Sequence, residues 1–134
     1  ALAVELPATP GARHLAAFQQ ARAAEAGNSP DEARKHYLDA LAALEKLPPS
    51  PAVDYRRAYL SALAGRDTEA EALYGRLLED NPQSLPVLLN LSEVKAALGK
   101  KQEALSLARS AARLAPDSEA ARQCLKRRGQ ENRP

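Results

Sequence analysis

Methionine and tryptophan are absent from this chain of 134 residues, which holds one phenylalanine and one cysteine, Cys124. A single cysteine cannot form an internal disulfide, and the sequence around Cys124 lacks a cluster of metal ligands, so disulfide-stapled and zinc-finger folds are excluded. No apolar run approaches the roughly 20 residues that a membrane-spanning helix needs. With no methionine to start translation, we expect a piece of a longer chain or a mature form without its original start.

Valine, isoleucine and threonine are also scarce, whereas 29 alanines and 21 leucines supply strong helix formers. No window alternates apolar and polar residues as a half-buried strand does. The composition therefore predicts an all-α fold whose thin helices approach one another closely. The formal net charge of +2 is too small to indicate nucleic-acid binding by itself.

Stop and start signals divide the chain into helices. Gly65 and Gly99 suit helix ends at which the backbone turns left-handed, and Ser29, Pro30 and Glu32 form a capping box at a helix start. We expect seven helices, at about residues 11–27, 30–47, 51–64, 67–80, 84–98, 101–115 and 118–128.

One stretch of the sequence is nearly repeated 34 residues later, since residues 63–84 align with residues 97–118. Pro48, Pro82 and Pro116 share the same spacing. A fixed period of this length is typical of solenoids, in which helix pairs stack because no pair can bury its apolar face alone.

These positions resemble the tetratricopeptide repeat (TPR), a helix–turn–helix unit of about 34 residues. The second halves of the repeats carry the resemblance best, through Gly65, Ala70, Tyr74, Leu77 and Pro82 in one repeat and Gly99, Ala104, Ala108, Ala111 and Pro116 in the next. One first half departs from the pattern, because Asp54 and Arg57 stand where large apolar residues are usual. The resemblance implies a right-handed α–α superhelix, a TPR-like solenoid of about seven antiparallel helices.

The resemblance also divides the chain. It implies a linker or expression remnant over residues 1–10, a TPR-like domain over residues 11–128 and a basic tail over residues 129–134. The domain then consists of an irregular repeat (11–48), in which Gly27 aligns with Gly65, two regular repeats (51–84 and 85–118) and a capping helix (118–128).

In the TPR family the first helices of the repeats line a concave groove that holds a peptide, and the resemblance implies the same groove here. The implied partner-binding residues are Tyr55, Arg56, Tyr59, Leu63, Leu89, Asn90, Glu93 and Arg127, with Phe18, Arg22, Glu25, Ala97 and Gln123 at further groove positions. Tyr55 and Tyr59 lie four residues apart, so both project from one helical face and offer an apolar surface with polar tips.

Each of these assignments has a simpler alternative. The two tyrosines would fill space against the alanine-rich first helix, and Asn90 and Arg56 would be solvated surface residues. One subtype of the family binds the C-terminal carboxylate of chaperones through Lys, Asn and Arg residues. Arg56 stands where that subtype has an asparagine, and Pro86 where it has a lysine, so we expect no chaperone clamp.

Basic residues gather at the end of the chain, namely Lys126, Arg127, Arg128 and Arg133. Positive charge at a helix C-terminus complements the helix dipole without any partner, and an acidic partner or anionic surface is the alternative. Nucleic acid is not expected, because no aromatic residues are interleaved with these charges.

Catalysis finds no support in the sequence, which lacks a phosphate-cradling glycine loop and metal-ligand spacing. We expect a non-catalytic scaffold for protein–protein interaction with no cofactor and no metal. The alternative is a self-association or regulatory domain of a larger enzyme.

The alanine-rich, methionine-free composition suggests a GC-rich bacterium. The resemblance then suggests a multi-protein assembly of the secretion, pilus, envelope or cytochrome-maturation type. No direct membrane insertion is expected, and the chain is either cytoplasmic or the periplasmic part of a membrane-anchored protein.

Overall fold

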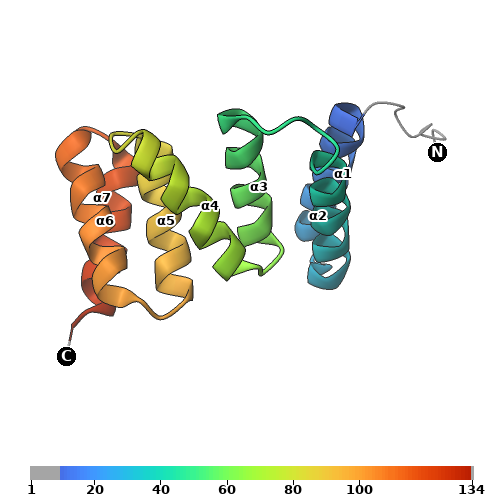
Figure 1. Ribbon diagram of the computed structural model, residues 1–134. Coiled ribbons are helices and arrows are strands. Elements are labelled where there is room, and N and C mark those ends of the chain that lie inside the picture. The colour runs from blue at the N-terminus through green and yellow to red at the C-terminus, as the bar shows by residue number, and fades with distance from the viewer. Residues whose placement is uncertain (1–9, 134) are drawn as a thin grey trace. The chain divides into compact units, whose positions relative to one another are not determined.

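The computed structural model describes residues 10–133, with side chains from residue 17 onward, and these residues form helices and turns without a strand (Figure 1). The helices are α1 (Pro10–Ala26), α2 (Pro30–Leu44), α3 (Pro51–Leu63), α4 (Asp67–Asp80), α5 (Leu85–Ala97), α6 (Lys101–Leu114) and α7 (Glu119–Glu131). The predicted all-α class and the order of the helices are confirmed. The expected linker lies outside the described residues except for Pro10, which begins α1.

The chain divides into two compact units, unit 1 (Ala1–Arg66) and unit 2 (Asp67–Pro134). Unit 1 contains α1 to α3, and unit 2 contains α4 to α7. The boundary follows the turn at Gly65, so it falls inside the predicted repeat 51–84. Each unit buries a core of its own.

The core of unit 1 lies where α2 packs against α1 and α3. Ala21 and Ala40 have no exposed surface, and their small side chains let the helices approach closely. Tyr37 fills the larger space and is 1% exposed. Leu60 of α3 is also 1% exposed, so its burial stabilises the unit by about 1.5–3 kcal/mol.

The core of unit 2 lies where α5 and α6 pack against each other, with α4 against α5 and α7 against α6. Ala104, Ala108 and Ala111 of α6 have no exposed surface. Leu88 and Ala121 bring α5 and α7 to the same cluster. Small buried residues recur at the repeat spacing in both units, as the aligned sequence positions predict.

Hydrogen bonds from polar side chains connect helices within each unit. In unit 1, Arg34 Nε of α2 donates a hydrogen bond of 2.8 Å to the carbonyl of Ala64, at the end of α3. In unit 2, Ser92 Oγ of α5 donates a bond of 2.8 Å to the carbonyl of Ala104 in α6. A buried hydroxyl without a partner would cost about 1–3 kcal/mol, so the second bond constrains how α5 and α6 pack.

An ion-pair network crosses unit 2. Glu71 of α4 accepts from Lys95 Nζ of α5 at 2.8 Å and from Lys100 Nζ, just before α6, at 2.7 Å. Lys95 also lies 3.4 Å from Glu103. The bonds from Lys100 and Lys95 hold the pKa of Glu71 below its ordinary value, and the bond to Glu71 raises the pKa of Lys95.

Three helix ends turn through a left-handed residue. Gly65 and Gly99 have φ of 81° and 78°, which confirms the prediction for both glycines. At the end of α1 the left-handed residue is Asn28, with φ of 65°, rather than Gly27. In all three turns the next amide reaches back to a carbonyl in the last turn of the helix, which satisfies a group that the helix leaves unpaired.

The predicted capping box at Ser29 is wrong. Ser29 precedes α2 but makes no side-chain cap, because its backbone (φ −116°, ψ 78°) differs from the extended conformation that Ser50 adopts (φ −155°, ψ 162°). Ser50 Oγ accepts from the amide of Val53 at 3.1 Å, and Ser118 Oγ accepts from Ala121 at 3.2 Å. Ser29 directly follows the left-handed Asn28, and this turn sets its backbone.

Most helix ends lie within one residue of the expected positions, but the ends of α2 and α7 each differ by three residues. α2 ends at Leu44, before the expected residue 47, and Lys46 and Leu47 continue in tighter turns. α7 continues to Glu131, so it includes residues that were assigned to the basic tail. Asn132 follows α7 and donates from Nδ2 to the carbonyls of Arg128 at 2.8 Å and Lys101 at 3.2 Å, which ties this end to the start of α6.

Candidate functional site

Unit 1 contains a pocket of about 230 Å³ between α1 and α3. Its lining residues are Phe18 of α1 and Tyr55, Arg56, Tyr59 and Leu60 of α3. This cavity is called the aromatic pocket below. The helical period brings the α3 residues together, because positions three and four apart share one face.

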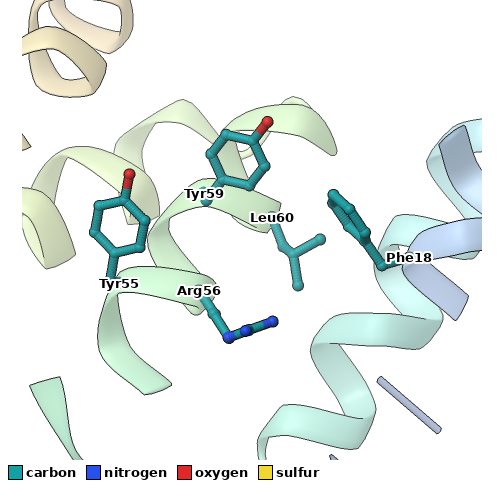
Figure 2. A pocket seen from close by; sticks show the side chains of 5 residues that line it. All are labelled: Phe18, Tyr55, Arg56, Tyr59 and Leu60. Atoms are coloured by element: carbon teal, nitrogen blue, oxygen red, sulfur yellow. The ribbon is translucent and has the colours of Figure 1, made fainter. Parts of the chain in front are cut away.

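Packed aromatic rings adjoin the aromatic pocket. Phe18 lies 6.2 Å from Tyr37 and 6.2 Å from Tyr59 between ring centroids, with interplanar angles of 53° and 47°. Tilted pairs at this separation are favourable ring arrangements. Leu60 forms the buried floor, and Figure 2 shows the Tyr55 and Tyr59 hydroxyls pointing to one side of it and the Arg56 guanidinium lying on the other.

Charged residues of α1 lie next to these rings. Arg22 Nη1 is 3.1 Å from Glu25 Oε2 at the surface. Burial raises the pKa of Tyr37, the Glu25 carboxylate raises it further, and the Arg22 guanidinium opposes the shift. Tyr37, whose ring lies 6.2 Å from that of Phe18, therefore stays protonated at neutral pH.

Unit 2 contains a pocket of about 300 Å³ between α5 and α7. Its lining residues are Leu89, Asn90 and Glu93 of α5 and Ala120, Gln123, Cys124 and Arg127 of α7. This cavity is called the polar pocket below. It has no aromatic lining residue. Instead of rings, the side-chain amides of Asn90 and Gln123 and the ion pair between Arg127 and Glu93 line it.

The ion pair in the polar pocket joins its two helices. Arg127 Nη2 donates to Glu93 Oε1 at 2.6 Å, and Arg128 Nη2 lies 3.5 Å from Glu93 Oε2. Arg128 also lies 3.2 Å from Glu131. Arg128, one of the basic residues gathered at the end of the chain, lies in the last turn of α7 and is only 4% exposed. Its burial among carboxylates follows from α7 packing along the core of unit 2.

Cys124 sits where the polar pocket meets the core. It is 1% exposed, and its Sγ lies 3.5 Å from Ser92 Oγ as a weak donor. Ser92 in turn donates to α6, so the thiol, the hydroxyl and the carbonyl of Ala104 form a short chain across three helices. Cys124 therefore packs against α5, a helix of the preceding pair.

The two pockets occupy equivalent repeat positions. Tyr55, Arg56 and Tyr59 precede Leu89, Asn90 and Glu93 by 34 residues, and these precede Gln123, Cys124 and Arg127 by another 34. Seven of the predicted partner-binding residues line a pocket: Tyr55, Arg56, Tyr59, Leu89, Asn90, Glu93 and Arg127.

Other expected groove residues lie elsewhere. Leu63 packs against the core of unit 1, and neither it nor Ala97 lines either of the two pockets. Sequence reasoning missed Leu60 and Cys124 as lining residues. A signal existed for both, since Leu60 follows Arg56 by four residues and Cys124 follows Asn90 by 34.

Two other features are absent from the residues that the structure describes. None of their His, Cys, Asp and Glu side chains form a group of three or more that could hold a metal ion. None of the helices that the structure describes is both long enough and apolar enough to cross a membrane.

Comparison with known families gives a match of residues 52–84 to the model of the tetratricopeptide repeat. This segment begins in α3 and runs through α4 to the turn before α5. No curated protein sequence matches significantly.

Solved TPR domains have the same fold. The OM64 TPR domain from Arabidopsis is 18% identical, with a TM-score of 0.56 over 88% of this chain and 95% of that one. The first TPR of Spaghetti (RPAP3), bound to the HSP90 peptide SRMEEVD, is 19% identical, with a TM-score of 0.59 over 92% and 95%. The second TPR domain of human RPAP3, in complex with the HSP70 peptide SGPTIEEVD, is 16% identical, with a TM-score of 0.58 over 90% and 98%.

Proposed function

We propose that this chain, which has the fold of a tetratricopeptide-repeat domain, is a non-catalytic interaction module that holds a segment of a partner protein. Each unit offers a docking face on helices that correspond to the first helices of the repeats, namely α1 and α3 in unit 1 and α5 and α7 in unit 2. The partner-binding residues in this proposal are those that line the aromatic and polar pockets.

The aromatic pocket carries the proposal. Phe18, Tyr55 and Tyr59 surround a cavity that opens to the surface instead of closing into the core. Aromatic side chains are rich in binding energy because they bury a large area and lose little conformational freedom. Tyr hydroxyls add hydrogen-bonding tips that suit a peptide backbone.

Two similar solved structures hold peptides, since the first TPR of Spaghetti (RPAP3) is bound to an HSP90 peptide and the second TPR domain of human RPAP3 to an HSP70 peptide. This chain carries Arg56 and Pro86 where the chaperone-binding subtype has asparagine and lysine. We therefore propose a peptide ligand other than a chaperone tail. Its setting is a bacterial multi-protein assembly, on the grounds of the alanine-rich, methionine-free composition.

Affinity capture with a paired variant tests the proposal. The immobilised chain and its Tyr55→Ala/Tyr59→Ala variant are exposed to the same native lysate, and bound proteins are identified by mass spectrometry. We expect one or a few proteins to be captured by the unchanged chain and lost from the variant. Circular dichroism of both should agree closely, because neither tyrosine is fully buried.

Lys35→Gln on the exposed face of α2 serves as the matched control, because it lies in unit 1 but outside the aromatic pocket. It should capture the same proteins as the unchanged chain. If the unchanged chain, the Tyr55→Ala/Tyr59→Ala variant and the Lys35→Gln control all capture the same proteins, the proposal is contradicted. Sedimentation at high protein concentration tests the competing hypothesis that the chain self-associates. A chain that sediments as a monomer would rule out that hypothesis.

A further inference from the structure

We propose that unit 2 carries a further docking surface, on the outer side of α6 and α7, which binds an acidic, extended segment of a protein partner. The surface consists of exposed cations and is called the basic face below: Arg109, Arg113, Arg122, Lys126 and Arg133. None of these five residues lines either of the two pockets, so the inference goes beyond the proposed function.

The helices α6 and α7 pack against each other and run in opposite directions (Figure 1). The hydrogen bond of 3.2 Å from Asn132 Nδ2 to the carbonyl of Lys101 places the end of α7 beside the start of α6. Both helices rise about 1.5 Å per residue, so Arg109 is level with the part of α7 between Arg122 and Lys126. Cations of the two helices therefore lie at the same height.

α7 has one side left for solvent. Its buried residues face the core of unit 2, and Gln123 and Arg127 line the polar pocket with α5. The remaining side carries Arg122, Lys126 and, just past the helix end, Arg133, all of them exposed. Their spacings of four and seven residues place them in one row along the helix, because two helical turns take about seven residues.

α6 places two more cations beside this row. Glu103 lies 3.4 Å from Lys95 of α5, and Leu107 packs in the core cluster, so these two residues mark the side of α6 towards α5. Arg109 and Arg113 are four residues apart on the side away from α5, and both are exposed. The basic sides of α6 and α7 thus form one continuous surface.

Three cations of the basic face have no carboxylate partner. Among the residues that the structure describes, none forms an ion pair with Arg109, Lys126 or Arg133. Arg127 and Arg128 of the same helix differ, because carboxylates of α5 and α7 pair with them. α7 therefore neutralises the arginines on its inner sides and leaves the cations on its outer side uncompensated.

The two other cations of the basic face have contacts within the chain. Arg122 Nη2 lies 2.9 Å from Glu119 Oε2, with side chains 59% and 68% exposed. Arg113 Nη2 donates to the uncharged Ser110 Oγ at 3.3 Å. Exposed pairs are weak and screened by salt, so these two residues still add to the positive potential of the surface.

Solubility alone does not account for this charge pattern. A helix at the end of a repeat stack needs a polar outer face, but mixed charges or uncharged polar groups satisfy that need. Cations of one sign repel one another, and an acidic partner relieves this repulsion. Charge complementarity of this kind guides association and fixes which partner binds.

The chemistry of the basic face favours a protein segment over a nucleic acid or a membrane. None of its five residues is aromatic, so it offers no ring on which bases stack. None is a large apolar residue of the kind that surface helices insert into a bilayer. The carboxylates of Asp and Glu need only the cations, with which they form charge-assisted hydrogen bonds.

The length of the row sets the length of the segment. Arg122 and Arg133 are about 16 Å apart along the helix axis, at a rise of 1.5 Å per residue. An extended chain advances about 3.3 Å per residue. An acidic stretch of about five residues therefore covers the basic face.

Anisotropy titration with a labelled acidic peptide tests this inference. The probe is an alternating Glu–Ala peptide of about six residues, and the matched neutral probe has Gln in place of each Glu. We expect the Glu probe to bind the chain and the Gln probe not to bind. Binding of the Glu probe should weaken as the salt concentration rises.

Paired variants locate the binding. Arg109→Gln/Lys126→Gln should weaken the Glu probe about fivefold or more. Lys35→Gln/Lys46→Gln removes the same two charges from exposed positions of unit 1 and should change affinity by less than about twofold. All of these substitutions are at exposed positions, so circular dichroism should show unchanged helical content.

Glu119→Gln gives a change of the opposite sign. It removes the carboxylate that pairs with Arg122, so the Glu probe should bind about twofold more tightly.

Three results would overturn the inference. One is no binding of the Glu probe, and another is an equal loss of affinity in the two double-lysine and arginine–lysine variants, which would indicate net charge alone. The third is tighter binding of a single-stranded oligonucleotide or of phosphatidylserine vesicles through Arg109 and Lys126, which would replace the protein segment by another anion.

The proposed function is judged separately. The Tyr55→Ala/Tyr59→Ala variant should bind the Glu probe as the unchanged chain does, and a loss of affinity there would place the probe at the aromatic pocket and contradict the basic face. If the Glu probe fails while protein capture still depends on the two tyrosines, the proposed function stands without the basic face.

Discussion

The aromatic pocket of unit 1 and the polar pocket of unit 2 lie at the same positions of a repeat and have opposite chemistry. Glu93 in the polar pocket stands 34 residues after Tyr59 in the aromatic pocket, at the equivalent repeat position. Asn90 likewise stands at the position equivalent to Arg56. The repeated backbone arrangement sets where a cavity forms between successive first helices. The side chains that differ between repeats set which chemical groups the cavity can bind.

The two units also differ in how their helices are held. Unit 1 relies on packed rings around Phe18 and on the Arg34–Ala64 hydrogen bond. Unit 2 has the Glu71 network across α4, α5 and the start of α6, and the Glu93 pairs between α5 and α7. Ring packing responds weakly to salt and pH, whereas ion pairs respond to both.

The largest effect should come from the floor of the aromatic pocket. Leu60→Ala removes a buried side chain from unit 1, so we expect a loss of about 2–5 kcal/mol in the free energy of unfolding measured with urea. Peptide affinity should fall as well, because the rings above Leu60 lose their support.

Val94 is the residue of unit 2 at the equivalent position, and it is 3% exposed. Val94→Ala should cost less than Leu60→Ala, because fewer buried atoms are removed, and it should leave binding at the aromatic pocket unchanged. Leu114→Ala is the exposed control, since Leu114 is 40% exposed. A stability loss at Leu60 no greater than at Leu114 would contradict the assigned core.

An intermediate effect should come from the left-handed turns. Gly99→Val in unit 2 and Gly65→Val at the end of unit 1 should each lower stability by about 1–2 kcal/mol, because a side chain at positive φ clashes with the backbone. Asn28→Gly should change stability by only a few tenths of a kcal/mol or raise it slightly, because asparagine already tolerates this conformation.

Thermal and urea unfolding of the three variants measure these differences. Equal effects at Gly65 and Gly99 would show that the same turn closes a helix in each unit. A change within error for Gly99→Val would rule out the left-handed turn at that position.

The smallest effect should come from the Glu71 network. Glu71→Gln should lower stability by about 0.5–1 kcal/mol at neutral pH and low salt. The pKa of Glu71 is depressed in the folded state, so its contribution is present above the unfolded-state pKa and is lost as pH falls through the lower folded-state value. The difference between variant and unchanged chain should therefore shrink in acid and in high salt.

Glu45→Gln, an exposed carboxylate at the end of α2 in unit 1, is the matched control and should change stability by less than about 0.5 kcal/mol at every pH. A Glu71→Gln difference that persists unchanged in acid would show that the network acts through packing and not through charge.

Many of the helix starts and ends follow from the local sequence. Gly65 and Gly99 were predicted to be left-handed, and they are, because glycine pays no steric penalty there. The starts at Pro30, Pro51, Asp67 and Lys101 follow from capping and proline chemistry that acts within a few residues. The resemblance to the tetratricopeptide repeat implied seven of the residues that line the two pockets.

Other features depend on residues far apart in the sequence. The burial of Arg128 depends on Glu93 of another helix, and the bond between Cys124 and Ser92 joins positions 32 apart. Ser29 failed as a cap because the preceding turn at Asn28 sets its backbone, which a residue-type pattern does not encode.

The sequence by itself determined the helices, their order and the repeat positions that face a common surface, because these depend on periodicity and on short-range sterics. Only the tertiary structure decided which of those positions enclose a cavity, that Leu60 lines the aromatic pocket, and that Glu93 pairs with Arg127 in the polar pocket. Cavities and ion pairs arise from distances between helices, and those distances are set by the packing of every side chain in the core at once.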